Sequence, residues 1–200
     1  MSIPSLAITG ATGHIGGLVA SNLSGSGVSQ LLLARSPKDA PDLPGAITRQ
    51  CSYENTEGSR TALTGVRTLF MVSASESHDR VDQHRSFIDA AVQAGVKHIV
   101  YLSFFGAASD ATFTLARDHW ATERHILESG VEHTFLRDNL YTDFLPHMVG
   151  EDGVIRGPAG NGRVAAVTRA DIARVAGVVL KEPSAHRGAV YDLTGPDGAP

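Results

Sequence analysis

Three glycines near the N-terminus are spaced by three residues, in the stretch LAITGATGHIGG that runs from Leu6 to Gly17. Gly10 permits a sharp turn out of a strand, and Gly13 leaves space where a phosphate group could approach the backbone. A helix that begins here would attract an anion through its free N–H groups and its dipole, and Gly16 would let that helix pack closely on the strand. The pattern predicts an anion-binding turn or a glycine-rich turn without a ligand, so its surroundings must decide.

The residues on either side favour a ligand. The loop follows an apolar run, Leu6–Thr9, and opens a segment of helical period, Ile15–Leu23. A second apolar run, Gln30–Ala34, completes a βαβ unit of about 30 residues, the arrangement typical of dinucleotide-binding folds. We therefore expect the whole loop to contact a dinucleotide cofactor: Gly10, Ala11, Thr12, Gly13, His14, Ile15 and Gly16.

The residues after the second apolar run bear on the choice of cofactor. A carboxylate there would bond the adenosine ribose and repel a 2′-phosphate, but this chain has Arg35 and Ser36. A guanidinium pairs with a phosphate through two parallel hydrogen bonds. The sequence thus predicts NADP(H), with NAD(H) the less favoured cofactor and Arg35 the discriminating residue; a surface arginine without this role is the alternative.

The four tyrosines, Tyr53, Tyr101, Tyr141 and Tyr191, all lack a lysine four residues further on. A lysine so placed lowers the pKa of a phenol that exchanges a proton with a substrate oxygen. Its absence argues against epimerase or alcohol dehydrogenase chemistry of the usual kind.

Short apolar runs alternate with segments of helical period along the whole chain. This alternation predicts an α/β fold of the Rossmann type, with a doubly wound parallel sheet. In the helix expected over Arg80–Ala94, we expect Val81, the stem of Arg85, Ile88 and Val92 to face the core. The expected strands are Leu6–Thr9, Gln30–Ala34, Ile47–Cys51, Thr68–Val72, His98–Ser103, His133–Leu136 and Val190–Leu193, and the other expected helices are Ile15–Leu23, Glu57–Leu63, Leu115–Ser129 and Asp171–Lys181.

Ligands of such sheets bind beyond the carboxyl ends of the strands. The residues expected near the ribose and pyrophosphate are Ser73, Ala74 and Ser75. Those expected near the nicotinamide are Ser103, Phe104 and Phe105, and the two phenyl rings either stack on a flat acceptor or pack in the core. After the sixth strand come Arg137, Asn139 and Tyr141, of which Asn139 bonds the carboxamide or holds a loop.

The organisation expected is a single domain over residues 1–200. From Leu145 to Gly162 the apolar pattern gives way to glycine, proline and charge, which is typical of a long loop or a small lobe. We assign residues 145–162 and 182–200 to a small C-terminal substrate lobe.

Composition excludes several classes of protein. The net charge of −4 comes without any basic run, so no nucleic-acid partner is expected, and no apolar run approaches the roughly 20 residues of a membrane span. Cys51 is the single cysteine, which rules out an intramolecular disulfide and fits a cytoplasmic protein. His119 and His125 are six residues apart and would point to different faces of a helix, so no metal site is expected.

Three longer stretches resemble the NmrA-like family of atypical short-chain dehydrogenases: QHRSFIDAAVQAGVKHIVYLS, HTFLRDNLYTDF and GRVAAVTRADIARVAGVVL. Within it, the chain is most similar to the branch of bacterial NAD(P)H:quinone oxidoreductases and triphenylmethane reductases. The resemblance extends from about Ile3 to Leu193. Relatives generally continue past the YDLTGP strand with further helices, whereas this chain ends at Pro200, which implies a fragment or a reduced lobe.

The resemblance implies an NADPH-dependent reductase of quinones or similar conjugated aromatic acceptors, with His119, Asn139 and Tyr141 on the catalytic side. His119 stands where some relatives carry a lysine. Because a reduced quinone is a phenolate-like anion whose conjugate acid has a pKa near ~10, it needs little help from a general acid, and water or His119 could complete the protonation. The alternative is a regulator that senses NAD(P) without turnover, and a homodimer is possible in either case.

Overall fold

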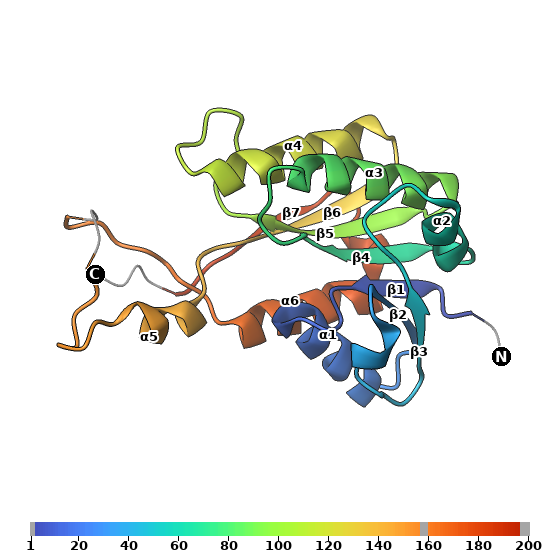
Figure 1. Cartoon of the computed structure of the whole chain (residues 1–200), viewed down its shortest axis with the longest axis horizontal. Helices are drawn as coiled ribbons and strands as arrows, with labels where there is room; N and C mark the ends of the chain where they lie inside the picture. The colour runs from blue at the N-terminus through green and yellow to red at the C-terminus, as the bar shows by residue number, and fades with distance from the viewer. Residues whose placement is uncertain (1–2, 157–159, 197–200) are drawn as a thin grey trace.

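A single parallel sheet organises the computed structural model, which describes residues 3–156 and 160–196 (Figure 1). The strand order is β3-β2-β1-β4-β5-β6-β7, and every neighbouring pair is parallel. The predicted Rossmann-type fold is confirmed. The strands are β1 Leu6–Thr9, β2 Gln30–Ala34, β3 Ala46–Gln50, β4 Thr68–Val72, β5 His98–Phe104, β6 Glu132–Asp138 and β7 Val190–Leu193.

Helices cover both faces of this sheet, with α3 and α4 on one side and α1 and α6 on the other (Figure 1). The buried apolar side chains form one cluster on each face: Ile8, Val19 and Ile172 belong to the first, and Phe87 and Ile126 to the second. The helices are α1 His14–Gly25, α2 Glu57–Leu63, α3 Arg80–Gln93, α4 Thr114–Glu128, α5 Leu145–Met148 and α6 Arg169–Lys181, with short 3₁₀ turns η1 Pro37–Asp39, η2 Thr142–Phe144 and η3 Pro183–His186.

The strand order reverses beside β1, which pairs with β2 on one side and with β4 on the other. The connections from β1 and from β4 therefore leave the sheet in opposite directions, and a crevice opens at the carboxyl ends of these two strands. The glycine loop, residues 10–16, lies at this switch point.

The face that α3 turns to the core differs from the prediction. Ile88 is buried and Val92 is half-buried, as expected, but Arg85 is exposed and Val81 only half-buried. The buried positions are instead Arg80, His84 and Phe87, among others. Arg80 and His84 are buried because their polar atoms find hydrogen-bond partners in the loop after β4 and in α4, which hydrophobicity alone does not reveal.

The second part of the predicted substrate lobe also extends the main sheet. Residues 183–193 form η3 and β7, and β7 pairs with β6, so this stretch belongs to the main sheet. The first part extends from the end of the molecule where α5 lies (Figure 1), with an isolated antiparallel bridge between Val149 and Ile155. Residues 157–159 and 197–200 of the predicted lobe lie outside the described residues. Among the helices that the structure describes, none has the length and apolarity needed to cross a bilayer.

Replacing Gly16 by alanine should destabilise the fold by about 1–3 kcal/mol, the usual cost of overpacking. A Cβ at Gly16 would lie 2.3 Å from the carbonyl oxygen of Gly10 and 2.8 Å from that of Thr9. Thermal unfolding without cofactor measures the effect. Gly25→Ala is the control in the same helix, because a Cβ there meets nothing within 4 Å; equal melting temperatures for the two variants would contradict the close packing of α1 on β1.

Candidate functional site

The glycine loop has the backbone geometry that its spacing predicts. Gly10 has a φ of +65°, in the left-handed region that favours glycine, and a Cβ there would lie 3.1 Å from the Cβ of Val72. Gly13 is the N-cap of α1, with φ −96° and ψ 177° that any residue adopts. A Cβ on Gly13 would meet only the Gly10 carbonyl oxygen, at 3.3 Å. The turn thus requires glycine at positions 10 and 16, where a side chain would strain or clash with the backbone. At Gly13, the missing side chain leaves open space in front of the helix.

Free amide groups stand at the start of α1. The Gly13 N–H donates to the Gly10 carbonyl at 2.8 Å, and the Gly17 N–H donates to the Gly13 carbonyl at 3.0 Å. The amides of His14, Ile15 and Gly16 lie between these two bonds, in the first turn, where an α-helix offers them no partner of its own. The first turn carries no acidic side chain. This end of α1 is therefore suited to bind an anion.

A surface hollow of about 460 Å³ opens beside the start of α1, where Gly13 and His14 line it. The guanidinium of Arg169, at the start of α6, lies over the Phe144 ring at 4.5 Å and over the Tyr141 ring at 5.1 Å. A helix N-terminus and a guanidinium fit a pyrophosphate. The residues that line the hollow are Ala11, Thr12, Gly13, His14, Gly17, Leu18, Ser21, Asp39, Pro41, Asp143 and Arg169.

Sequence reasoning found the loop part of this hollow and missed Asp39, Asp143 and Arg169. The signal available for Arg169 was its place beside the N-cap Thr168, whose side chain accepts a hydrogen bond from the Asp171 N–H. The side chain of Ile15 is buried in the core, so Ile15 can contact the cofactor only through its backbone amide. Arg35 is exposed directly after β2 and does not line the hollow.

Two side chains of α3 hold the loop after β4 through the backbone of Ala74. The Ala74 N–H donates to Nε2 of His84 at 2.8 Å, and Nε of Arg80 donates to the Ala74 carbonyl at 3.0 Å. Since both backbone groups of Ala74 are engaged, Ser73 and Ser75 are the neighbours free to meet a ligand. Burial lowers the pKa of His84 to about 3, so His84 is a neutral acceptor.

His119, predicted to help protonate the reduced acceptor, is buried at 5% exposure. Its Nε2 lies 3.1 Å from Nη2 of Arg80, and its Nδ1 lies 2.9 Å from the hydroxyl of Tyr101. Because arginine only donates, Nε2 must accept, and the ring proton sits on Nδ1 toward Tyr101. Burial, with Arg80 adding to it, holds the pKa of His119 well below its usual range. The imidazole is neutral, and both of its nitrogens are engaged inside the protein.

Two further predicted contacts are used inside the protein, on the face that α4 covers. The hydroxyl of Ser103 is buried and donates to Oε1 of Glu123 at 2.6 Å. Arg137 donates to the same carboxylate through Nε at 2.9 Å and Nη2 at 2.6 Å. The hydroxyl proton of Ser103 is therefore committed to Glu123, and the expected position of Ser103 near the nicotinamide stays a prediction.

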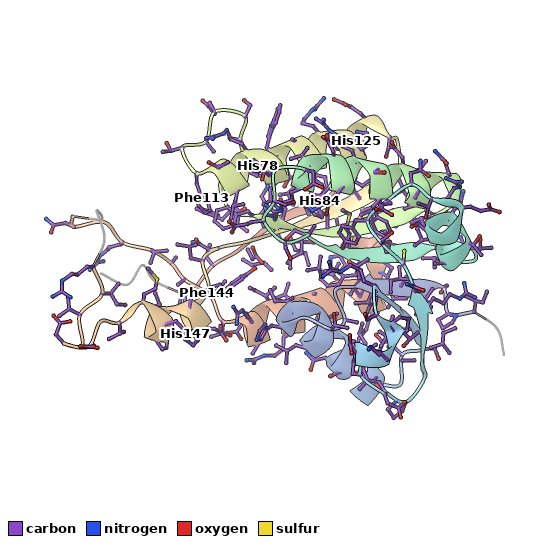
Figure 2. All side chains as sticks on the ribbon, in the orientation of Figure 1. His78, His84, Phe113, His125, Phe144 and His147 are labelled. Carbon is purple, nitrogen blue, oxygen red and sulfur yellow. The ribbon has the colours of Figure 1, made fainter. Side chains whose placement is uncertain are left out.

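The aromatic residues at the end of β5 remain near the surface at the same edge. Phe104 is half-buried, with its ring centre 5.3 Å from that of Phe113, and Phe105 is 42% exposed. Phe113 and Phe144 lie at the end of the molecule from which α5 extends (Figure 2). This placement is compatible with both predicted roles of the phenylalanines, stacking on a flat acceptor and packing in the core, since Phe104 packs on Phe113 and still reaches the surface.

The polar side chains of Asn139 and Tyr141, which follow β6, make different kinds of contact. Nδ2 of Asn139 donates to the Ala165 carbonyl at 3.1 Å, and its Oδ1 accepts from the Leu140 N–H at 2.8 Å. Asn139 thus holds the loop, the second of its two predicted roles. The Tyr141 hydroxyl donates to Oδ2 of Asp138 at 2.8 Å, a carboxyl that sequence reasoning passed over. Within residues 3–156 and 160–196, no group of three acidic, histidine or cysteine side chains is arranged to hold a metal.

A family model described as NAD(P)H-binding matches residues 10–183. The chain is 39% identical over 197 residues to quinone oxidoreductase 2 of Escherichia coli K12, covering 95% of this chain and 68% of that protein. It is 30% identical to an NAD(P)H azoreductase of Xenophilus azovorans, covering 94% of this chain and 67% of that protein. The structure superposes on Citrobacter sp. triphenylmethane reductase complexed with NADP(H) with a TM-score of 0.87 and 34% identity, covering 98% of this chain and 71% of the other. The chain spans about two thirds of the length of these proteins.

Replacing Gly13 by valine should abolish binding at the hollow and leave the fold intact. The isopropyl group would fill the space in front of the α1 amides, while the backbone angles at Gly13 suit valine. The measurement is the shift in melting temperature that NADPH produces, with Gly25→Val as the control in the same helix. A Gly13→Val protein that NADPH stabilises as much as it stabilises the parent would show that the loop is a turn without a ligand.

Proposed function

Because the chain belongs to the NAD(P)H-binding, NmrA-like family, we propose that it is an NADPH-dependent reductase of quinones or similar conjugated aromatic acceptors. The observation that carries this proposal is the start of α1 opening into a hollow that also holds the Arg169 guanidinium, at the point where the strand order reverses. The quinone oxidoreductase, the azoreductase and the triphenylmethane reductase described above favour this function over a regulator that senses the cofactor.

The residues of the hollow would bind the phosphates of NADPH. The free amides at the start of α1 would bond the pyrophosphate beside Gly13 and His14, and Arg169 would approach it from α6. Held in this way, the cofactor supplies a hydride from its nicotinamide ring. The chain itself contributes binding and orientation, which account for much of the rate when an acceptor is held close to its donor.

A conjugated acceptor suits the side chains at the nicotinamide end. No tyrosine has a lysine four residues on, so strong general acid catalysis of the usual type is missing. Quinones need less help, because their reduced form is a stabilised anion. Phe105, Phe113 and Phe144 are all more than 40% exposed, and such rings could stack on a flat acceptor. We assign residues 145–156, together with these rings, to the acceptor side.

His119 and Asn139 act in this proposal as positioning residues. His119 accepts from Arg80, which in turn donates to the Ala74 carbonyl and so fixes the loop after β4. Asn139 fixes the loop before Tyr141. A cytoplasmic location, a small aromatic acceptor as the partner and a homodimer complete the proposal; the single cysteine supports the first, and sedimentation velocity would test the last.

The loss of NADPH absorbance in the presence of p-benzoquinone tests the proposed function. We expect turnover that saturates with both substrates and is absent in the Gly13→Val variant. Tight binding of NADPH without turnover of any quinone, azo dye or triphenylmethane dye would overturn the reductase proposal.

Replacing Arg35 by alanine should weaken NADPH binding by about 1.5–3 kcal/mol, the range for a hydrogen bond to a charged group. NADH binding should be nearly unchanged, because NADH lacks the 2′-phosphate. Calorimetric titration with both cofactors measures the difference. Asp39→Asn is the control, since Asp39 lines the hollow and its loss should not lower the affinity for NADPH. An equal loss of NADPH and NADH affinity in Arg35→Ala would mean that Arg35 does not read the 2′-phosphate.

A further inference from the structure

Neighbouring residues at the end of β6 enter two different environments. Phe135 packs in the cluster on the α3 side and Leu136 in the cluster on the α1 and α6 side, as the alternation of a strand requires. Arg137 follows Phe135 and pairs with Glu123 of α4. Asp138 follows Leu136 to the other side and is 3% exposed. Arg137, the neighbour of Asp138 in sequence, therefore pairs with Glu123 on the opposite face of the sheet.

Asp138 has one side-chain partner, the Tyr141 hydroxyl at 2.8 Å. Among the residues that the structure describes, no cation lies within ion-pair distance of Asp138. The neighbouring strands place Phe104 of β5 and Leu193 of β7 beside it, and neither is charged. Burial and the neighbouring Asp138 raise the pKa of Tyr141, whereas Arg169 from α6 and, more weakly, Arg80 from α3 act against this shift.

The pair lies next to the cofactor hollow. Tyr141 forms a parallel bridge with Val167, two residues before Arg169, and the Arg169 guanidinium lies 5.1 Å from the Tyr141 ring centre. That guanidinium lines the hollow together with Gly13 and His14. Because β6 ends at the same edge of the sheet as β1 and β4, Tyr141 lies on the path that a dinucleotide would take from the glycine loop toward β5 and β6.

We propose that Asp138 sets the direction in which Tyr141 donates its hydroxyl proton and resupplies that proton, so that the pair protonates the reduced acceptor. This inference rests on the proposed reductase function. The carboxyl of Asp138 has no role in cofactor binding by the glycine loop, and it is not part of a tyrosine–lysine pair.

Two protonation states of Asp138 place the phenolic proton differently. As a carboxylate, Asp138 only accepts, and the Tyr141 hydroxyl donates its proton to Oδ2 across an oxygen–oxygen distance of 2.8 Å. As a carboxylic acid, Asp138 can donate to the Tyr141 oxygen, which leaves the phenolic proton free to turn toward an acceptor. Burial raises the pKa of Asp138 to about 7, with the Tyr141 hydrogen bond acting against this shift, so both states are populated near neutral pH.

The proton balance closes without any group beyond those already named. An acceptor that has gained a hydride carries a negative oxygen and needs one proton. The Tyr141 O–H bond breaks as that proton moves to the acceptor oxygen, and the Asp138 O–H bond breaks as its proton moves to the Tyr141 oxygen. Asp138 then takes one proton from water, so each turnover consumes one proton and the two electrons of one NADPH.

The pH dependence of turnover with p-benzoquinone tests this role. We expect the kcat of the parent to fall about tenfold per pH unit above pH 7, as Asp138 becomes a carboxylate. In Asp138→Asn the amide N–H groups can donate to the Tyr141 oxygen at every pH, so kcat should be independent of pH between 6 and 9 and at most about tenfold below the parent at pH 6. Tyr141→Phe should lower kcat at pH 6 by about tenfold or more, within the usual range for general acid catalysis.

Thermal unfolding of the free protein gives a readout without cofactor or acceptor. The pKa of Asp138 in the folded protein is raised above that in the unfolded chain, so the unfolded state releases this proton first. The folded protein should thus lose stability as the pH rises from about 4 to about 7. The melting temperature of Asp138→Asn relative to the parent should rise across this range and then stay level. Asp152→Asn is the control: Arg156 holds the pKa of the exposed Asp152 below its usual range, so the relative melting temperature of this variant should not rise with pH.

The two experiments separate the inference from the function on which it rests. A parent that binds NADPH but reduces no acceptor would overturn the proposed function and the catalytic step together. An active parent whose pH profile is unchanged by Asp138→Asn would overturn the inference alone. A relative melting temperature of Asp138→Asn that is constant from pH 4 to pH 8 would also overturn it, since Asp138 would then titrate like an exposed carboxyl.

Discussion

The seven strands that the structure describes all run in the same direction, and this constraint determines where the chemistry of the protein can occur. Parallel strands bring their carboxyl ends to one edge, so the segments after β1, β4, β5 and β6 must meet there. The reversal of strand order beside β1 then opens the edge at one place, in front of α1. The glycine loop, the loop held by Arg80 and His84, and the Asp138–Tyr141 pair all depend on this arrangement.

Successive side chains of a strand point to opposite faces of the sheet, so the polar groups at that edge lie on two different faces. On the face that α4 covers, Ser103 and the partly exposed Arg137 both donate to the buried carboxylate of Glu123, which ties α4 to β5 and β6. On the face that α6 covers, the one side-chain partner of Asp138 among the described residues is the Tyr141 hydroxyl. The carboxylate on the first face is therefore paired with a cation, and the carboxyl on the second is a titratable group beside the hollow.

Local sequence was sufficient for the strands and for the glycine loop. β1, β2, β4 and β7 begin and end at the predicted residues. For β1, β2 and β4 the reason is local, because runs of buried apolar side chains define strands of a parallel sheet without help from distant residues, whereas β7 is a partly exposed edge strand. The turn at Gly10 also follows from local backbone freedom.

The side-chain partners could not be predicted in the same way. Ser103 donates to a residue 20 positions away, and His119 accepts from one 39 positions away, so their roles depend on how α4 packs on the sheet and on α3. Arg169 reaches the hollow from α6, far along the chain from the glycines. A pattern of residue types shows which groups are present at the edge of the sheet, but hydrogen bonding across helices decides which of them remain free.

A crystal structure of the chain with NADP⁺ bound would test this account most directly. The account predicts the pyrophosphate against the amides of His14, Ile15 and Gly16, with the Arg169 guanidinium beside it and the nicotinamide ring within reach of the Tyr141 hydroxyl. A cofactor bound away from the start of α1, or one whose nicotinamide lies on the other face of the sheet from Tyr141, would contradict it.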